Sequence, residues 1–262
     1  MEFDNNTCPF PILEFDNSTE VAISPQHESL NLSLPPKAVF AFLGDEIESF
    51  ANRHGATPIS HFVSSTKKYP IYLIDWNGER VCLCQAPVGS SASTQMLDWL
   101  YAYGLHTVIS AGSCGVLSFF PENYILVPTH ALRDEGTSYH YLKPSRYVQL
   151  DDDCVKQIAS YLSLNGIHFS LCKTWSTDGF FRETINKINS RKEEGCQTVE
   201  MECAALAACA IYRGKKFGML LYAADLLENP NEIDERTWGI DSKQSILPLC
   251  LDILSSLHFN SF

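Results

Sequence analysis

The stretch TVEMECAALAACAIYRG, residues 198–214, places Glu200 and Glu202 directly before a run of Cys, Ala, Leu and Ile. The run is apolar on every side, which is typical of a buried helix. Burying a carboxylate without a partner costs free energy. The two glutamates at the start of this helix therefore need partners, either in the protein or in a ligand.

Apolar strand-like segments alternate with helix-like segments on both sides of this stretch. Strands are predicted at residues 38–43, 107–117, 124–132, 168–181 and 216–227. Helices are predicted at residues 44–55, 93–104, 153–166 and 246–257. The buried helix is expected directly after the strand at 168–181. Apolar strands that alternate with helices indicate an α/β fold with a largely buried sheet.

Short signals mark where several of these elements begin or end. Residues 70–87 predict a β-hairpin around Asn77-Gly78, because Asn-Gly between apolar runs is the strongest short hairpin signal. Asp45 is a candidate N-cap for the first helix, and Gly55 is expected to end it. Pro248 is expected in the first turn of the last helix, where proline is tolerated.

The sequence predicts a single domain at residues 37–262 and an N-terminal arm at residues 1–36 that packs on it. The arm is polar, contains proline and has little hydrophobic patterning, whereas 45% of the whole chain is hydrophobic. The formal net charge of −12 argues against a surface for nucleic acid or for an anionic membrane. Neither kind of partner is therefore expected.

The ten cysteines predict reduced thiols and a cytoplasmic protein. Most of them lie in apolar runs, where buried free thiols are found. No C-x-x-C pair occurs, and Cys82 and Cys84 are expected on opposite faces of a strand, so no metal site is predicted. No run of about 18 apolar residues occurs, and a membrane span is therefore not expected.

Residues 110–115, SAGSCG, are the first candidate binding segment. A strand is expected to run into a glycine turn here, and such a turn can aim backbone N–H groups and the Ser113 hydroxyl at an anion or a sugar. The alternative is that Gly112 and Gly115 only provide the backbone angles of a tight turn. The segment alone does not decide between the two.

The acids of the opening stretch also have two interpretations. Glutamates in a first helical turn complement the helix dipole, and one acid is enough for that. A carboxylate that points into a pocket can instead accept hydrogen bonds from two adjacent hydroxyls, as on a ribose, with Met201 as an apolar floor for the sugar. Spacing alone leaves both interpretations of Glu200 and Glu202 open.

Two further segments follow predicted strands. Asp225 comes after apolar strand residues, and it is either an N-cap or a general acid whose pKa is raised by burial. Phe180 and Phe181 follow a polar turn, and they either stack on a planar base or belong to the core.

Together these segments resemble the superfamily of purine nucleoside phosphorylases and uridine phosphorylases, which also contains the methylthioadenosine/adenosylhomocysteine nucleosidases. The motifs GSCG, STDGFF, VEMECAAL and YAADLL occur in the family's order, and the resemblance covers residues 38–257. It implies a three-layer α/β sandwich with a mixed, partly barrel-like central sheet. It also implies cleavage of a ribosyl N-glycosidic bond, no metal or organic cofactor, and a homo-oligomer, either a dimer or a trimer of dimers.

The resemblance assigns a role to individual residues. Glu202 would bind the ribose 2′ and 3′ hydroxyls, Met201 would pack on the sugar, and Asp225 would protonate a purine leaving group. The remaining substrate-binding candidates are Ser113 at the phosphate or water position, Phe181 near the base and His140 near the sugar 5′ end, together with Gly112 and Glu200.

The chain departs from the family pattern where phosphate is bound. Arginines are expected at two positions that hold Glu48 and Ser110, and their loss weakens binding of a dianion. In an alignment with the nucleosidases, Glu46 instead falls on the carboxylate that activates water, although it is equally a first-turn helix acid. Other arginines (Arg133, Arg146, Arg182 or Arg236) are candidates to rebuild an anion site.

The expected partner is a small-molecule nucleoside. Three hypotheses follow for the function of the protein. The first is a nucleoside phosphorylase, acting on a purine-like nucleoside because Asp225 is present, with phosphate as co-substrate. The second is a hydrolytic nucleosidase that uses water. The third is a non-catalytic nucleoside-binding relative, against which the retained acids argue.

Overall fold

The computed structural model describes residues 8–229 and 231–259. Within them the strands are β1 (Lys37–Ala41), β2 (Pro58–Val63), β3 (Lys68–Trp76), β4 (Glu79–Gln85), β5 (Thr107–Val116), β6 (Ile125–Asp134), β7 (Tyr147–Gln149), β8 (Phe169–Thr177), β9 (Thr198–Glu200) and β10 (Lys216–Leu226). The α-helices are α1 (Glu46–Arg53), α2 (Ser90–Ala102), α3 (Asp152–Leu164), α4 (Ile185–Glu193), α5 (Cys203–Tyr212) and α6 (Ser242–Ser256). Three short 3₁₀ turns accompany them: η1 (Pro11–Leu13), η2 (Thr137–His140) and η3 (Phe180–Arg182).

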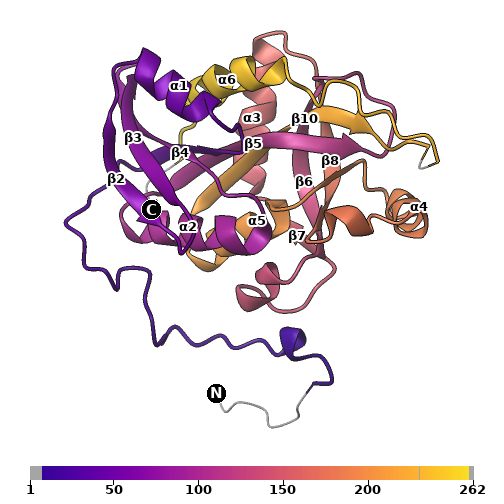
Figure 1. Cartoon of the computed structure of the whole chain (residues 1–262), viewed down its shortest axis with the longest axis horizontal. Coiled ribbons are helices and arrows are strands. Elements are labelled where there is room, and N and C mark those ends of the chain that lie inside the picture. The colour runs from indigo at the N-terminus through magenta and orange to yellow at the C-terminus, as the bar shows by residue number, and fades with distance from the viewer. Residues whose placement is uncertain (1–7, 230, 260–262) are drawn as a thin grey trace.

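Five strands of the sheet close into a barrel. Strand β5 pairs parallel with β10, β10 antiparallel with β6, and β6 parallel with β8. Strand β8 then pairs parallel with β9, which returns antiparallel to β5. From β5 the sheet continues outward through β1, β4, β3 and β2 (Figure 1). The mixed, partly barrel-like sheet expected from the resemblance is therefore confirmed.

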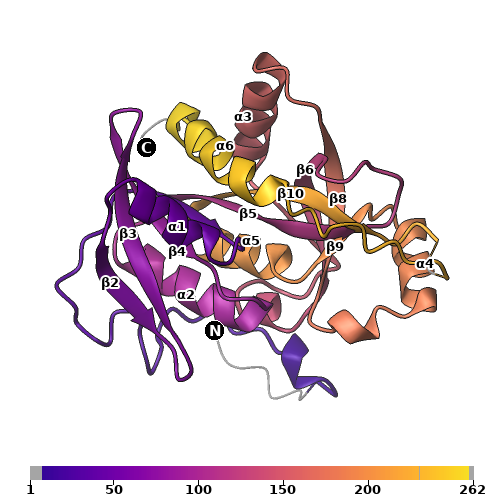
Figure 2. The same cartoon turned by 45° about the horizontal axis from the view of Figure 1, so that its top comes forward.

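Helices cover both faces of the sheet. Helices α1, α3 and α6 lie on one side and α2 and α5 on the other, which makes three layers (Figures 1 and 2). Helix α5 is buried along nearly its whole length, because its Ala and Cys side chains are small enough for close packing against α2 and the sheet. The large side chains that fill the core include Phe40, Trp175 and Phe217.

The hairpin and the ends of the first helix agree with the sequence analysis, with one exception. Strands β3 and β4 pair through Trp76 and Glu79 around Asn77-Gly78. Asp45 occupies the N-cap position of α1, but its side chain makes no capping hydrogen bond, because it is exposed and its backbone is already helical. The predicted N-cap position of Asp45 is therefore confirmed, although its side chain does not cap the helix.

Three local predictions are wrong. Residues 110–115 form no turn, because β5 continues through Val116 with β10 and β9 as neighbours. Helix α4 stands between β8 and β9, where no helix was predicted, and Thr198–Glu200 forms a strand rather than the start of α5. Pro248 lies inside α6, because that helix begins at Ser242, one turn earlier than its apolar spacing indicates.

The cysteines of the described part of the chain are free thiols, and all of them except Cys8 are buried. The Sγ atoms of Cys82 and Cys84 lie 3.5 Å apart, so the prediction that they face opposite sides is wrong. Residues two apart on a strand share a face. Within the described ranges, no three His, Cys, Asp or Glu side chains group as metal ligands do. Nor does any described helix combine the length and apolar character that crossing a membrane requires.

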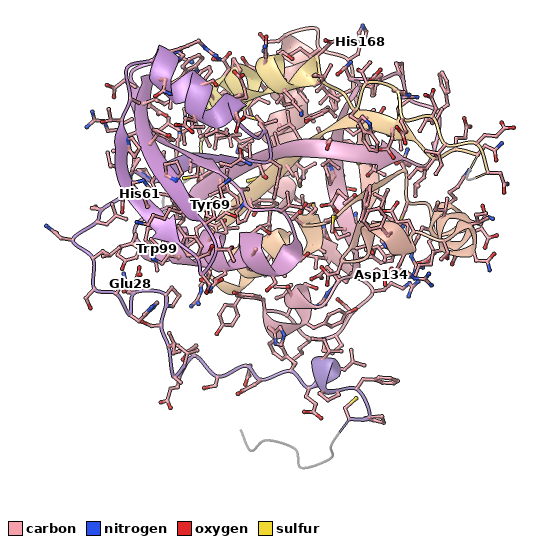
Figure 3. The ribbon with its side chains drawn as sticks, in the orientation of Figure 1. Glu28, His61, Tyr69, Trp99, Asp134 and His168 are labelled. Carbon is pink, nitrogen blue, oxygen red and sulfur yellow. The ribbon has the colours of Figure 1, made fainter. Side chains whose placement is uncertain are left out.

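Residues 8–36 run as an extended segment along the α2 side of the molecule, and residues 1–7 of the predicted arm lie outside the described part. Glu28 accepts a hydrogen bond of 3.3 Å from the Trp99 indole (Figure 3). The Gln26 amide donates to Ala102 O, and Leu34 N donates to Tyr103 O. These contacts attach the segment to the C-terminal end of α2.

Candidate active site

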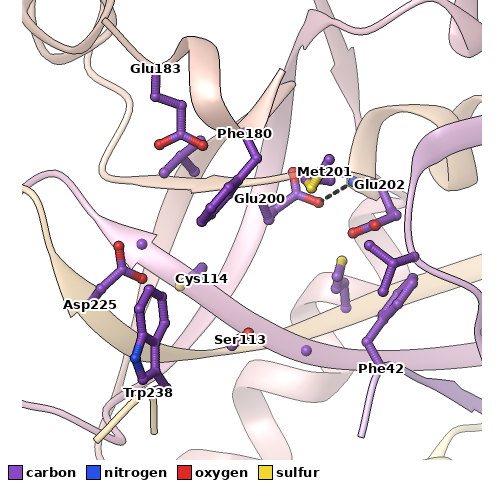
Figure 4. Close-up of a pocket in the computed structure, with 15 residues that line it drawn as sticks. Phe42, Ser113, Cys114, Phe180, Glu183, Glu200, Met201, Glu202, Asp225 and Trp238 are labelled. Atoms are coloured by element: carbon purple, nitrogen blue, oxygen red, sulfur yellow. Dashed lines mark hydrogen bonds between the residues drawn. The ribbon is translucent and has the colours of Figure 1, made fainter. Parts of the chain in front are cut away.

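A pocket of about 200 Å³ lies beside the closed part of the sheet. It brings together side chains from β5, β9, β10, η3 and several loops (Figure 4). Its lining consists of Phe42, Val88, Gly112, Ser113, Cys114, Gly115, Phe180, Glu183, Val199, Glu200, Met201, Glu202, Met219, Asp225 and Trp238. Six of the predicted site residues are therefore collected in one place: Gly112, Ser113, Glu200, Met201, Glu202 and Asp225.

Glu200 is held by the protein itself. Its Oε2 accepts hydrogen bonds from the backbone N–H groups of Glu202 (2.7 Å) and Cys203 (2.6 Å), at the start of α5. Its Oε1 accepts hydrogen bonds from the hydroxyls of Thr174 and Ser176 on β8. Because both oxygens have protein donors, this geometry favours a role for Glu200 in positioning Glu202 over direct contact with a ligand.

Glu202 faces the pocket with most of its hydrogen-bonding capacity unused. Its Oε1 accepts one hydrogen bond of 2.6 Å from Gly89 N, just before α2. Gly89 has a φ of 97°, which non-glycine residues rarely adopt, so this approach of the backbone depends on glycine. Burial, followed by the negative charge of Glu200, raises the pKa of Glu202 to about 8. The carboxyl can accept further donors from a ligand, and donors of that kind lower its pKa.

Asp225 and Glu183 lie toward the opposite end of the pocket from Glu202 (Figure 4). Burial raises the pKa of Asp225 above its ordinary value, against a smaller opposing effect of Arg236. Burial also raises the pKa of Glu183 to about 7, and the charge of Asp225 adds to that shift. This end therefore holds two acids that retain protons at a higher pH than ordinary carboxyls.

The GSCG segment is part of a strand and not a turn, and it contributes to the pocket because its glycines leave room for neighbouring side chains. A Cβ atom on Gly115 would lie 2.9 Å from Leu227 Cδ1 and from Val199 Cγ1, and 3.1 Å from Asp225 Oδ2. Only a residue without a side chain lets β5 pass this closely beneath the Asp225 carboxylate. The glycine at this position thus helps to place the acid.

We expect Gly115→Ala to lower the free energy of unfolding by about 1–3 kcal/mol, because the added methyl group overpacks the site. Turnover should fall as well, since Asp225 must move. Urea unfolding and an activity assay measure the two effects. Gly112→Ala is the matched control for stability, because its Cβ would meet Phe42 only at 3.4 Å, an ordinary contact. Equal unfolding midpoints for the two variants would contradict the expectation.

The lining contains four acids and, among the described residues, no lysine, arginine or histidine. Ser110, where an arginine is expected, is buried with its hydroxyl unpaired. Glu48 lies in a separate hollow of about 160 Å³ that also contains Lys67 and Lys68.

None of the candidate arginines lines the pocket. Arg133 is buried and donates to Ser138 and to backbone carbonyls, and Arg146 pairs with Glu194. Arg236 donates to the backbone carbonyl of Phe120 and does not line the pocket. Arg182 is exposed on η3. The described residues of this chain therefore place no cation where a phosphate would lie beside the sugar.

Three predicted site residues lie elsewhere. Phe181 is 93% exposed, and its neighbour Phe180 lines the pocket instead. Glu46 pairs with Arg53 along α1, outside the lining. His140 lines a second cavity of about 680 Å³, between residues 16–27 and helices α2 and α5. None of these three residues lines the pocket, and their roles stay predictions.

Several lining residues were missed by the sequence analysis. Phe42, Val88, Glu183, Met219 and Trp238 carry no motif of their own, and each lies in a different element or loop. A weak signal exists for Glu183 and Trp238, because an acid two residues after a pair of phenylalanines and an isolated tryptophan in a polar loop are both unusual. In the sequence, Phe42, Val88 and Met219 look like ordinary apolar core residues.

Comparison with known proteins agrees with this architecture. A family profile described as "Phosphorylase superfamily" matches residues 36–247. A guanosine phosphorylase from Halorubrum lacusprofundi is 24% identical over 162 residues, which cover 62% of this chain and 67% of that protein.

Solved structures give the same result for the fold. A uridine phosphorylase from Vibrio fischeri superposes with a TM-score of 0.71 at 17% identity, covering 86% of this chain and 95% of that one. An AMP nucleosidase from Bacteroides thetaiotaomicron superposes with a TM-score of 0.69 at 21% identity, covering 88% and 91%. Because the profile spans most of the sequence, the chain belongs to the phosphorylase superfamily, whose members include nucleoside phosphorylases and nucleosidases.

Proposed function

We propose that the protein cleaves the N-glycosidic bond of a purine-like nucleoside and transfers the ribosyl group to phosphate. The observation that carries this proposal is the pocket itself, which holds Asp225 at one end and Glu202 with Met201 at the other. A general acid and a sugar-binding carboxylate on opposite sides of one cavity match the two halves of a nucleoside.

In the proposed reaction Glu202 accepts hydrogen bonds from the ribose 2′ and 3′ hydroxyls, and Met201 packs on the sugar. As the bond between C1′ and the base nitrogen lengthens, its electron pair passes to the base and positive charge develops on the sugar. The Glu202 carboxylate stabilises that charge. Protonated Asp225 donates its proton to the base, and an oxygen of phosphate bonds to C1′. The products are the free base and ribose 1-phosphate.

Hydrolysis is the second candidate, and the charge of the pocket favours it. Four carboxyls line the cavity without a basic side chain from the described residues, and such a lining repels a phosphate dianion. Water carries no net charge and is not repelled. The similarity to a guanosine phosphorylase supports phosphate instead. Ser113, exposed toward the pocket from β5, is proposed to contact the acceptor in either case.

Product analysis distinguishes these candidates. Purified protein is incubated with a panel of nucleosides and with 5′-methylthioadenosine, each with and without phosphate, and both products are identified by mass. We expect free base and ribose 1-phosphate only when phosphate is present. Free sugar regardless of phosphate would establish hydrolysis instead. Tight nucleoside binding without any product would support the third hypothesis, a non-catalytic relative.

The same preparation tests the proposed assembly. We propose a homo-oligomer, either a dimer or a trimer of dimers, as the family resemblance implies. Light scattering on the eluting protein gives its mass, and the 29.4 kDa chain mass makes one, two and six copies easy to separate. A monomer at the concentrations used for the activity assay would contradict this part of the proposal.

A further inference from the structure

Trp238 lies in the loop between β10 and α6, and its ring lies toward the same end of the pocket as Asp225 (Figure 4). The residue is 45% exposed, so one part of the side chain forms the pocket wall while the rest meets solvent. The reaction proposed above uses Asp225 but gives Trp238 no role. The position of this ring therefore decides how that end of the pocket is closed.

The backbone around Trp238 has an uncommon conformation. Arg236, Trp238 and Gly239 have φ angles of 51°, 58° and 64°, so three of four consecutive residues are in the left-handed region. Residues with a side chain rarely adopt this region, and for a bulky residue such as tryptophan it is a genuine outlier. A backbone of this kind persists only where the surrounding structure holds it, and such positions are concentrated at functional sites.

Glu122, in the loop between β5 and β6, holds this turn. Its Oε1 accepts hydrogen bonds from the backbone N–H groups on either side of Trp238, which are those of Thr237 (2.8 Å) and Gly239 (2.9 Å). The Thr237 hydroxyl donates to the same oxygen at 2.6 Å. That hydroxyl, followed by the Gly239 N–H, lowers the pKa of Glu122, as hydrogen bonds to the charged form do. Glu122 itself does not line the pocket.

Other contacts fix the two sides of the turn. Arg236 donates to a backbone carbonyl of the β5–β6 loop (2.9 Å). Asn123 Oδ1 accepts hydrogen bonds from the backbone N–H and the hydroxyl of Ser242 at the start of α6. A Cβ atom on Gly239 would lie 2.7 Å from the Tyr222 ring, so the backbone passes directly against β10. Between these points, Glu122 holds the part of the loop that carries the indole.

We propose that Glu122 is a positioning residue of the active site, which holds the Trp238 ring in place as a stacking wall for the planar base of the nucleoside. An indole offers a large apolar face on which a base stacks. The inference rests on the proposed function for the presence of a base at this end of the pocket. The mechanical link between Glu122 and Trp238 does not depend on it.

Steady-state kinetics with guanosine and adenosine test the role of Glu122. Glu122→Ala should raise KM about 5- to 10-fold and leave kcat within a few-fold, because a stacking contact contributes to binding rather than to the chemical step. Glu122→Gln keeps an acceptor oxygen and should stay within about 3-fold of wild type. The control is Glu232→Ala, because Glu232 is an exposed acid of the same loop that pairs with Asn229. A purely structural Glu122 would lower the folded fraction and leave KM unchanged.

Substitutions of Trp238 test the contact with the base. Trp238→Ala should raise KM about 5- to 150-fold, the range expected for loss of a stacked aromatic ring. Trp238→Phe keeps an aromatic face and should recover most of that loss. A wild-type KM in Trp238→Ala would overturn the inference.

Tryptophan fluorescence reports the position of the ring without catalysis. The chain has four tryptophans, and Trp238 is the most exposed of them. Its share of the quenching by acrylamide is the difference between the wild type and Trp238→Phe. We expect Glu122→Ala to increase that share about two-fold, because the released ring meets more solvent. Guanosine should protect Trp238 from acrylamide in the wild type and protect it less in Glu122→Ala.

The outcomes separate this inference from the proposed function. Unchanged acrylamide quenching or an unchanged KM in Glu122→Ala would overturn the inference alone, provided that product is formed. Protection of Trp238 by guanosine without any product, together with increased quenching in Glu122→Ala, would refute the proposed cleavage and leave the role of Glu122 standing.

Discussion

Asp225→Asn is expected to lower kcat for purine nucleosides by about 10²- to 10⁴-fold, the usual contribution of a general acid. A purine leaves as a strongly basic anion unless it is protonated while the glycosidic bond breaks. Burial raises the pKa of Asp225, which favours the protonated form that a proton donor to the base needs. Asparagine has nearly the same shape but cannot transfer that proton.

A substrate that needs no proton provides the control. p-Nitrophenyl riboside releases a stable phenolate, so its cleavage by Asp225→Asn should stay within a few-fold of wild type, while cleavage of the purine nucleoside collapses. Circular dichroism and urea unfolding should show an intact fold, because the Asp225 side chain is only partly buried. Wild-type turnover of purine nucleosides by Asp225→Asn would remove the residue from the mechanism.

Glu202→Gln is expected to lower kcat about 10²- to 10³-fold, because a fixed charge beside the developing positive sugar is lost. The same substitution should make the protein more stable at pH 8. Burial and the neighbouring Glu200 raise the pKa of Glu202 from its ordinary 4.5 to about 8, so the folded state holds a proton that the unfolded chain releases. A variant that loses activity and gains stability is the signature expected of a residue retained for function.

The direction of the stability change in Glu202→Gln follows from how the ionisation of Glu202 depends on pH. The folded-state pKa of Glu202 lies above its unfolded value, so its contribution to stability is greatest below about pH 4.5 and falls as the pH rises toward 8. The slope is at most about 1.4 kcal/mol per pH unit. Glutamine does not titrate, and the stability difference between Glu202→Gln and wild type should therefore grow from pH 5 to pH 8. Urea unfolding over that range measures it, and a pH-independent difference would contradict the assignment.

The sequence predicted those parts of the fold that depend on local patterns. The apolar runs identified β1, β5, β6, β8 and β10, because a buried strand or helix needs apolar side chains wherever it packs. It failed where two structures share one pattern, as at Thr198–Glu200, which looks like a helix start and is a strand. It also missed α4, whose polar sequence has only Ile188 buried.

The candidate site, like the fold, could be predicted from the sequence only in part. The motifs alone located Glu202, Met201, Asp225 and Ser113, and the structure places all four in one pocket. The motifs did not distinguish Phe180 from Phe181, since adjacent residues of one type differ only in the direction that the backbone gives them. The burial of Glu200 by four protein donors was likewise not visible, because two of those donors come from β8.

By itself, the sequence determined the α/β class and the family and singled out the acids that are proposed to act in the chemistry, because these follow from short-range periodicity and contiguous motifs. Only the tertiary structure decided which residues from distant segments line one pocket together with these acids. Glu183, Asp225 and Trp238 lie in separate segments of the chain, and the closing of β5, β10, β6, β8 and β9 into a barrel brings them together. Contacts of that kind depend on distances in space that no local pattern encodes.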